Sequence, residues 1–499
     1  MAADDAVYLS DGNQCEKINP ATGETQATFR LKRPDARWGT MRVWEDRLIC
    51  TVFLPDAKGE YQPEEIVSID RNTGAQVWRH EAEYTAPIAA LGRETVFFYD
   101  GILEGLHDAW KRRGLPPKTG ETGYLKALDI RTGKPIWQSG TSRAVTWLGV
   151  SSQDGVLVAS NKKGMEAWDG KSGQPLWEKE QEGKGFVGHP ESVWDKVILW
   201  NDRIIDQRGP GLAYDVKTGK QLMKDHPLTG QPTPWEFTKT GHHCNYAVAS
   251  PHMLTFRAGT AGFLDLESGT TGRLNGFRSG CRNSLIPAGG VLNAPNFAHG
   301  CICHYSLFTS LALVHTPDAD VWTYNAYKAP SGPIDRLGVN LGAPGDRQDR
   351  NGTLWLDYPS VGGPSPKINI SVVGENVRYF RGHSLTVDGE LPWVAASGCE
   401  GLTSIKVRVG QAKANQECRV KLFFSDLGPG EEGDRVFDVA LQGKPVLQKF
   451  DIRKAAGSNS RGVIRSFDSI AINDTIEVTF KALAGRPSLA GIEIVAVEN

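Results

Sequence analysis

A turn motif that recurs six times along the chain is the feature that most constrains its fold. Each copy reads, with some drift, apolar-Asp-x-x-(Thr/Ser)-Gly-x-x-apolar, and three copies end on Trp. The copies are Ile18–Phe29, Ser68–Trp78, Ala127–Trp137, Ala167–Trp177, Ala213–Met223 and a weaker one at Phe263–Leu274. Their turn glycines follow one another at intervals of 40 to 59 residues. A period of this length is typical of proteins built from repeated supersecondary units.

Each copy of the motif predicts two strands joined by a tight turn. The Asp and Thr/Ser side chains close the turn by hydrogen bonds, and Gly supplies the positive φ that it needs. A further β-rich run precedes most copies, which gives about four strands per repeat, as in a propeller blade. We expect the Trp of each outer strand to pack against the neighbouring blade. Six motifs and a β-rich stretch at Ser284–His315 predict seven blades, and Asp320–Pro330 could complete an eighth with the N-terminal strand.

The motif resembles the tryptophan-docking repeat of PQQ-like (quinoprotein-dehydrogenase-like) β-propellers, over about Asp5–Ala329. Quinoprotein dehydrogenases of this fold carry two adjacent, disulfide-bonded cysteines over the quinone, and acidic residues around a calcium ion. No two cysteines are adjacent in this chain. The sequence therefore does not favour PQQ and assigns no cofactor, with structural zinc or calcium left open.

The remainder of the chain reads as strands without the turn motif. Its stretch Val420–Ile494 resembles the malectin/di-glucose-binding family, whose members are carbohydrate-binding β-sandwiches. The fold expected is therefore all-β, with a propeller over residues 1–329 and a malectin-like, galactose-binding-like jelly roll over residues 330–499. Aromatic side chains stack on the apolar faces of sugar rings. The candidates for this role are Trp355, Tyr358, Tyr379 and Phe380.

Composition limits the partners and the compartment. The formal net charge of −2 argues against a nucleic-acid binder. No run of eighteen apolar residues is present, so we expect no membrane span. The opening MAADDAVYLS lacks a basic and an apolar region, which indicates either a removed leader or a cytosolic start. Two β domains, one of a sugar-binding type, favour a secreted or periplasmic protein with a carbohydrate partner, and the oligomeric state stays open.

Four cysteines gather near the end of the predicted propeller. Cys301 and Cys303 are two residues apart, so on a strand both point to one face, where Cys244 and Cys281 could meet them. We expect two disulfides in an oxidising compartment. A tetrahedral zinc site made by the same four residues is the alternative. A third bridge is expected between Cys399 and Cys418, whereas Cys15 and Cys50 are expected to be buried thiols.

Histidine, arginine, asparagine and tyrosine residues surround this cluster. Counting back from the apolar strand of each blade places several of them at equivalent inner positions of the propeller. The predicted catalytic residues are His189, His243, Arg282 and Tyr305. The predicted ligand-binding residues are His242, Asn245, Arg278, Asn283, His299 and His304, together with Trp355, Tyr358 and Tyr379 of the second domain.

This set of residue types suits a polysaccharide lyase. Arg or Asn would neutralise a uronate carboxylate, while His and Tyr would move protons at the reacting carbon and the leaving oxygen. The function expected is an extracytoplasmic carbohydrate-active protein with a lyase-type centre in the propeller. A non-catalytic glycan-binding or scaffold protein is the first alternative, and a PQQ-dependent oxidoreductase is the second. Hydrolysis would need two opposed carboxylates, for which Glu191 and Asp265 are the nearest candidates.

Overall fold

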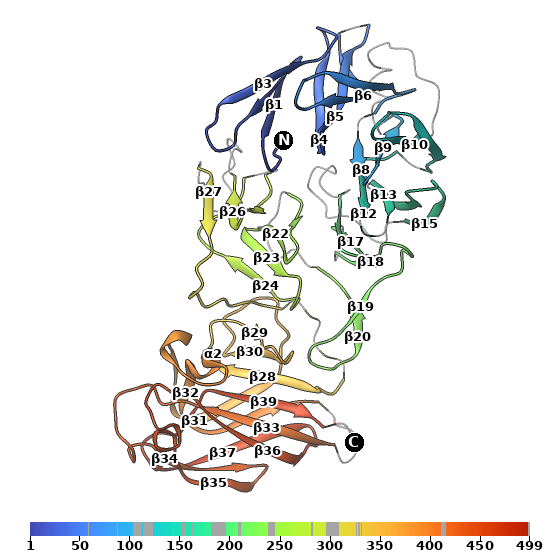
Figure 1. Ribbon diagram of the computed structural model, residues 1–499. Helices are drawn as coiled ribbons and strands as arrows, with labels where there is room; N and C mark the ends of the chain where they lie inside the picture. Colours follow the sequence, from blue (N-terminus) through green and yellow to red (C-terminus); the bar gives the residue numbers. More distant parts are fainter. Residues whose placement is uncertain are drawn as a thin grey trace. The chain divides into compact units, whose positions relative to one another are not determined.

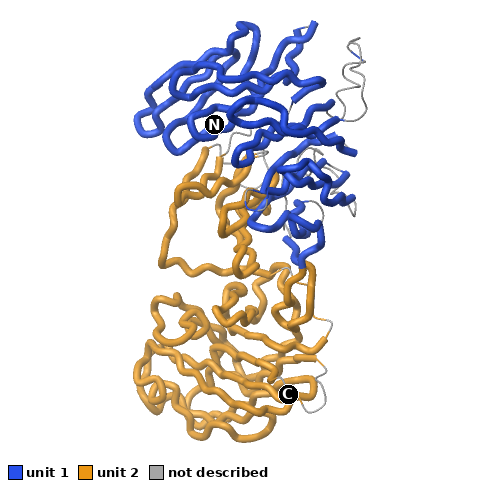
Figure 2. The backbone as a smooth tube through the Cα atoms, turned by 45° about the vertical axis from the view of Figure 1, so that its right-hand side comes forward, with its two compact units in different colours: residues 1–222, 235–237 blue, residues 223–234, 238–499 orange. Residues whose placement is uncertain are grey.

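The fold is known from a computed structural model. The structure describes residues 1–57, 59–86, 88–102, 112, 123–142, 144–151, 153, 155–161, 163–180, 196–207, 211–237, 245–280, 283–295, 309–325, 327, 330, 332–410 and 416–497. The chain forms two compact units (Figure 2). Unit 1 holds residues 1–222 and 235–237, and unit 2 holds residues 223–234 and 238–499. The predicted domain boundary at residues 329/330 does not coincide with this division and stays a prediction.

In the described part of unit 1, five antiparallel sheets follow one another along the chain (Figure 1). The first sheet contains β1 (Val7–Asp11), β2 (Gln14–Ile18) and β3 (Thr25–Arg30). The second contains β4 (Arg37–Trp44), β5 (Arg47–Pro55), β6 (Tyr61–Asp70) and β7 (Gln76–Glu81). The third contains β8 (Ala89–Leu91), β9 (Thr95–Asp100), β10 (Tyr124–Asp129) and β11 (Pro135–Gly140). The fourth contains β12 (Trp147–Ser151), β13 (Val156–Asn161), β14 (Gly164–Asp169) and β15 (Pro175–Glu180), and the fifth β16 (Val197–Trp200), β17 (Arg203–Asp206) and β18 (Ala213–Asp215).

The recurring turn forms because its Asp accepts several hydrogen bonds. In the third sheet the Asp129 Oδ1 accepts bonds from Thr132 N and Thr132 Oγ1, both at 2.7 Å, and from Arg131 N at 3.1 Å. The chain reverses at Gly133, where φ is +70° and a Cβ would be strained. The predicted hairpin turn is therefore confirmed, with the hydrogen bonds expected of it.

Tryptophans dock the second, third and fourth sheets of unit 1 onto the sheet that follows each. The Trp78 Nε1 donates to the Ile130 carbonyl oxygen at 2.9 Å, and its ring lies against the turn glycine, Gly133. Trp137 and Trp177 repeat this arrangement, with Nε1 donating at 3.0 Å to a carbonyl oxygen of the following sheet. Separate apolar clusters join the first sheet to the second, the second to the third, the third to the fourth and the fourth to the fifth. The expectation that each Trp packs on the neighbouring blade is confirmed.

Unit 2 begins with short strands. β19 (Met223–Asp225) pairs with β20 (Pro232–Pro234). One sheet contains β21 (Val248–Ala249), β22 (Met253–Ala258), β23 (Thr260–Asp265) and β24 (Thr271–Leu274), and another β25 (Ile286–Ala288), β26 (Val291–Ala294) and β27 (Leu311–Val314). With the five sheets of unit 1, the described part of the chain holds seven sheets of three or four strands before the sandwich. In the segment proposed for an eighth blade, Tyr324 bridges Thr271 and Thr323 bridges Asp346, and its pairing with the N-terminal strand stays a prediction.

The rest of unit 2, where it is described, is a β-sandwich of one mixed sheet and one antiparallel sheet (Figure 1). One sheet has the order β29 (Arg347–Gln348), β30 (Leu354–Tyr358), β28 (Arg336–Leu341), β39 (Gly491–Ala496), β33 (Glu417–Phe424) and β36 (Val463–Ala471). The other has the order β31 (Ile370–Arg381), β32 (Ser397–Arg408), β37 (Thr475–Ala484), β34 (Val436–Leu441) and β35 (Lys444–Asp451), with β38 (Ser488–Leu489) paired to β32. Short helices lie between strands: η2 (Ser384–Thr386), α2 (Pro392–Ala395) and α3 (Ile452–Ala456). The all-β class, a propeller followed by a sandwich, is confirmed.

The cysteines of the sandwich correct one expectation. Cys399 lies on β32 and Cys418 on β33, and these strands belong to different sheets. Both side chains are buried in the common core as free thiols, so the predicted bridge between them is wrong. The predicted buried thiols, Cys15 and Cys50, are confirmed. The described helices include none that is long and apolar enough to cross a membrane.

Candidate functional site

Most residues of the predicted propeller site lie outside the described part of the chain. They are His189, His242, His243, Arg282, His299, His304 and Tyr305, with the four cysteines Cys244, Cys281, Cys301 and Cys303. Their catalytic, ligand-binding, disulfide or zinc roles therefore stay predictions. Asp265, the hydrolase candidate that is described, is a turn residue whose Oδ1 accepts bonds from Glu267 N and Ser268 N.

The three described members of that predicted site, Asn245, Arg278 and Asn283, are joined by hydrogen bonds around Ser279. Asn245 is 1% exposed, and its Nδ2 donates to Ser279 Oγ at 2.9 Å and to the Asn283 carbonyl oxygen. Arg278 is 2% exposed and donates from Nη1 to the Ser279 carbonyl oxygen at 3.0 Å. The fold thus brings these residues together, and the bonds of Asn245 tie two loop segments to each other.

Trp355, expected to stack on a sugar, belongs to the interior of the sandwich. Its side chain is fully buried, and its ring makes edge contacts with Trp393 at 5.8 Å and Phe423 at 5.0 Å between centroids. The Trp355 Nε1 donates to Asp349 Oδ2 at 3.1 Å. A ring with no exposed face cannot stack on a ligand, so Trp355 is a core residue.

Tyr358 and Tyr379, in contrast, form an aromatic pair at the edge of the sandwich. Tyr358 ends β30 in one sheet, and Tyr379 lies near the end of β31, the edge strand of the other. Their rings meet edge to face with centroids 6.4 Å apart, and Tyr379 is 39% exposed. Phe380, the next residue, is half-buried. Two of the predicted sugar-stacking residues, distant in sequence, are therefore neighbours in space.

Gly342 brings the two sheet edges close enough for this pair to form. Its N–H donates to the Tyr358 carbonyl oxygen at 2.7 Å, and its carbonyl oxygen accepts a bond from Arg381 Nε at 2.9 Å. Its φ is +75°, and a Cβ there would lie only 2.7 Å from the Phe380 carbonyl oxygen. A residue other than Gly would push the two edges apart.

Burial favours the uncharged forms of several groups beside the tyrosine pair. Burial raises the pKa of Tyr379, so its hydroxyl is protonated at neutral pH. Burial also raises the pKa of the neighbouring Cys399 thiol to about 12. The pKa of the Asp357 carboxyl is raised by burial as well, although its Oδ2 accepts a bond from Val361 N at 2.7 Å. Such an edge suits a neutral ligand better than a charged one.

A rigid loop lies at the same end of the sandwich. In the strand register Cys399 lies opposite both Tyr379 and Leu489, and Glu400 lies opposite Ser488. Ser488 Oγ donates to the carbonyl oxygen of Ser425, where the loop between β33 and β34 begins. Glu400 accepts a bond from Arg435 Nη2 at 2.6 Å, where this loop ends. The loop 425–435 is therefore anchored next to the tyrosine pair.

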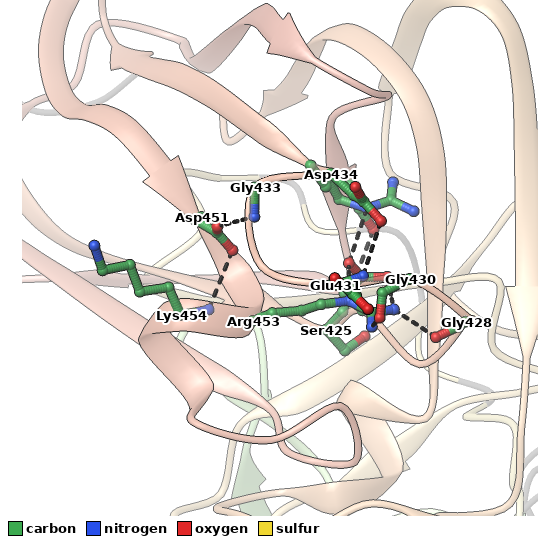
Figure 3. Close-up of polar contacts among 12 residues, drawn as sticks. Ser425, Gly428, Gly430, Glu431, Gly433, Asp434, Asp451, Arg453 and Lys454 are labelled. Carbon is green, nitrogen blue, oxygen red and sulfur yellow. Dashed lines mark hydrogen bonds and ion pairs between the residues drawn. The ribbon is translucent and has the colours of Figure 1, made fainter.

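Arg453 braces the inside of this loop (Figure 3). Its guanidinium donates to Asp426 Oδ2 at 2.9 Å from Nε, to the Gly428 carbonyl oxygen at 2.5 Å from Nη2, and to the Gly430 carbonyl oxygen from Nη1. Asp451 caps α3 through Lys454 N at 3.1 Å and also accepts Gly433 N at 2.7 Å. Charge-assisted bonds of this kind are strong, so the loop backbone is held in one arrangement.

Arg453 is not among the site residues predicted from the sequence. The run FFSDLGPGEEGDR between two strands shows only a turn-rich loop, and Asp451 before IRKAAG has the pattern of a helix N-cap. These signals could have predicted the loop and the cap. They could not have predicted that Arg453 reaches back to Asp426, which lies 27 residues earlier.

The described arrangement offers groups whose chemistry suits a sugar. Aromatic rings at an edge offer stacking surface, and a fixed loop offers backbone donors and acceptors for hydroxyl groups. Among the described residues no group of three or more His, Cys, Asp and Glu side chains is arranged to hold a metal ion.

Family models match two parts of the chain. Residues 409–491 match the malectin domain, and residues 121–251 match the outer membrane protein assembly factor BamB. BamB from Burkholderia pseudomallei is 23% identical over 274 residues, which are 46% of this chain and 65% of that protein. Polyvinylalcohol dehydrogenase from a Pseudomonas species is 25% identical over 243 residues, 45% of this chain and 29% of that protein. The chain spans less than two thirds of the length of either relative.

A solved structure, BamB from Moraxella catarrhalis, is 16% identical and aligns with a TM-score of 0.36 over 58% of this chain and 78% of that one. The recurring Asp-to-Gly turns, the docked tryptophans and the C-terminal sandwich agree with the two family matches. The chain is a PQQ-like repeat protein that carries a C-terminal malectin domain.

Proposed function

We propose that this protein is a glycan-binding protein of an extracytoplasmic compartment, and that the Tyr358–Tyr379 edge of the sandwich is its sugar-binding surface. The observation that carries the proposal is the half-exposed tyrosine pair, set beside a braced loop in a domain of the malectin type. The ligand is a neutral oligosaccharide, because Tyr379 is uncharged at neutral pH and the nearby carboxylates are already hydrogen-bonded.

The proposed compartment is supported by two considerations. The name of the matched family, outer membrane protein assembly factor, places those proteins outside the cytoplasm. The four described thiols are buried, and burial raises the pKa of Cys15 to about 11 and of Cys418 to about 12. Since the thiolate is the form that reacts, such thiols can persist in an oxidising compartment.

A catalytic role is not part of the proposal. The lyase centre expected at His189, His243, Arg282 and Tyr305 lies outside the described residues, so no described geometry favours it over binding. The sequence also lacks the adjacent cysteines that a quinoprotein resemblance implies, and no step is assigned to a quinone.

Titration of the full chain with neutral oligosaccharides tests the proposal. Calorimetry or ligand-observed NMR with glucose-, galactose- and mannose-containing oligosaccharides should give millimolar to micromolar dissociation constants, about 4 to 8 kcal/mol of binding free energy. Loss of the ring in Tyr379→Ala should weaken binding about tenfold, a typical value for an aromatic contact, whereas Tyr379→Phe should keep the stacking.

The matched control is Leu483→Ala, which removes another exposed apolar side chain, 47% exposed, from the same sandwich. It should leave the affinity unchanged. Equal affinities of the wild type and Tyr379→Ala, or no binding across the whole panel, would contradict the proposal.

A further inference from the structure

A pocket of about 460 Å³ lies in unit 2, at one end of the sandwich. It is formed by the residues just before β31, by the end of β32 and by the segment that leads into β28. The strands β31 and β32 pair from Ile370 opposite Val407 to Arg381 opposite Ser397, and Tyr379 lies near the far end of this ladder. The pocket is therefore separate from the tyrosine pair. Its volume is within the range of roughly 300–1,000 Å³ that is typical of small-molecule sites.

Hydrogen bonds between main-chain groups hold the walls of this pocket together. The Ile334 N–H donates to the Val409 carbonyl oxygen at 2.8 Å, and the Arg408 N–H donates to the Asn369 carbonyl oxygen at 2.9 Å. The Val409 N–H donates in turn to the Asp474 carbonyl oxygen at 2.9 Å. Segments that are distant in sequence are thus fixed to one another, so the pocket is a preorganised part of the sandwich.

The walls of the pocket are aliphatic. Its apolar lining consists of Pro330, Pro333, Ile334, Ile368 and Val409, and none of the described lining residues is aromatic. Stacking on a sugar ring needs an aromatic side chain, which this lining does not supply. An aliphatic wall instead favours the burial of a hydrocarbon body, by about 25 cal/mol for each Å² removed from water.

The charged groups of the pocket are cationic. Its described lining contains Lys367, Asn369 and Arg408 but no acidic side chain. Arg408 pairs with Asp474 through Nε, 3.0 Å from Oδ2, so this ion pair does not use the two terminal nitrogens of the guanidinium. Lys and Arg side chains bind carboxylates by charge-assisted hydrogen bonds. Because Asp474 balances one of the two positive charges, a ligand with a single negative charge matches the pocket better than a dianion.

We infer that this pocket is a binding site for a small organic carboxylate with an apolar body. The carboxylate contacts Lys367 and Arg408, and the apolar body packs against Pro333 and Ile334. The site is independent of the glycan-binding proposal, because it shares no residue with the Tyr358–Tyr379 edge and selects a ligand of opposite character, charged and apolar instead of neutral and polar.

Ligand-observed NMR on the full chain tests the inference with three probes. Benzoate, which has both an apolar ring and a carboxylate, should bind saturably in the millimolar range. Acetate lacks the ring and should bind at least about tenfold more weakly. Benzyl alcohol keeps the ring without the charge and should bind at least about fivefold more weakly, the upper end for one exposed ion pair. Absence of saturable benzoate binding, or equal affinities for benzoate and benzyl alcohol, would overturn the inference.

Substitutions locate the binding. Lys367 is exposed, so Lys367→Gln is compatible with folding, and it should weaken benzoate binding about fivefold. Arg408→Gln should have a similar effect. The matched control is Lys406→Gln, which removes a cation of the same strand that pairs with Glu477 at 3.1 Å outside the pocket, and it should leave the affinity unchanged.

The tyrosine edge needs its own control, because benzoate also has a ring that can contact tyrosines. Tyr379→Ala should leave benzoate binding unchanged while it weakens binding of the neutral oligosaccharide. Loss of benzoate binding in Tyr379→Ala, unchanged affinity in Lys367→Gln, or an equal loss in Lys406→Gln would each refute the site. None of these results would affect the glycan-binding proposal, which the oligosaccharide titration tests separately.

Discussion

Replacing Gly133 by Ala tests how the sheets of unit 1 are joined. At this turn φ is +70°, and a Cβ would lie 2.7 Å from Trp78 Cδ2 and 2.8 Å from Trp78 Cε3. Gly23 occupies the equivalent turn of the first sheet with φ of +74°, but nothing lies within 4 Å of its Cβ position. Gly23→Ala is therefore a control with the same backbone strain and no clash.

The expected losses of stability follow from the backbone strain at positive φ and from the clash with Trp78. The left-handed conformation costs about 1–2 kcal/mol for Ala, reduced by about 0.4–1 kcal/mol because Ala restricts the unfolded chain. Gly23→Ala should thus lower the free energy of unfolding by about 1 kcal/mol. Gly133→Ala adds overpacking of about 1–3 kcal/mol, because Trp78 is 7% exposed and its Nε1 is fixed to the Ile130 carbonyl oxygen. We expect a total of about 3 kcal/mol.

Urea unfolding followed by tryptophan fluorescence measures the difference in stability between Gly133→Ala and Gly23→Ala. Both the midpoints and the slopes of the unfolding curves should be compared, because a chain of two units need not unfold in one step. A double-mutant cycle with Trp78→Ala isolates the clash, since the extra cost of Gly133→Ala should disappear once the ring is gone. Equal losses in Gly23→Ala and Gly133→Ala, or a cost of Gly133→Ala that persists without Trp78, would refute the docking argument.

Four further outcomes are expected. Trp355→Ala should destabilise unit 2 by about 3–5 kcal/mol in thermal unfolding, as for a large core side chain, whereas a surface ligand contact would leave stability unchanged. Cys15 and Cys399 should resist alkylation at pH 8 in the native protein and react in denaturant, as seen by intact mass, because burial raises their pKa to about 11 and about 12. Burial raises the pKa of the Asp346 carboxyl to about 6. The protonated carboxyl therefore contributes stability that is full below about pH 4 and is lost as the pH rises through about 6. Asp346→Asn should change the slope of the free energy of unfolding against pH in this window by at most about 1.4 kcal/mol per pH unit. Arg453→Ala removes the guanidinium that pairs with the buried Asp426 carboxylate. Amide hydrogen exchange in the loop 425–435 should then accelerate. Unchanged protection of these amides would show that Arg453 does not hold the loop.

The parts of the structure that are local in sequence were predictable from it. The Asp129–Gly133 turn depends on hydrogen bonds within five residues, so its pattern is legible in the chain itself. The docking of Trp78 on the next sheet could also be anticipated, because the repeat places a Trp and a turn glycine at the same point of each unit. The malectin-type sandwich was recognisable because the stretch Val420–Ile494 resembles that family in the order and spacing of its strands and in its closing GIEI.

What the sequence could not decide was which strands of the sandwich meet. Cys399 and Cys418 are separated by one loop, and sequence proximity suggested neighbouring strands, but the chain crosses to the opposite sheet between them. The same uncertainty applies to Trp355 and Tyr358, which are three residues apart on β30 and have similar aromatic character. Only the packing of the two sheets buries Trp355 among Trp393 and Phe423 and leaves Tyr358 at the edge beside Tyr379. Hydrogen bonds between residues close in sequence can be predicted from the sequence. Whether an aromatic residue lies in the core or at the edge depends on long-range strand pairing, which buries one face of a strand and exposes the other.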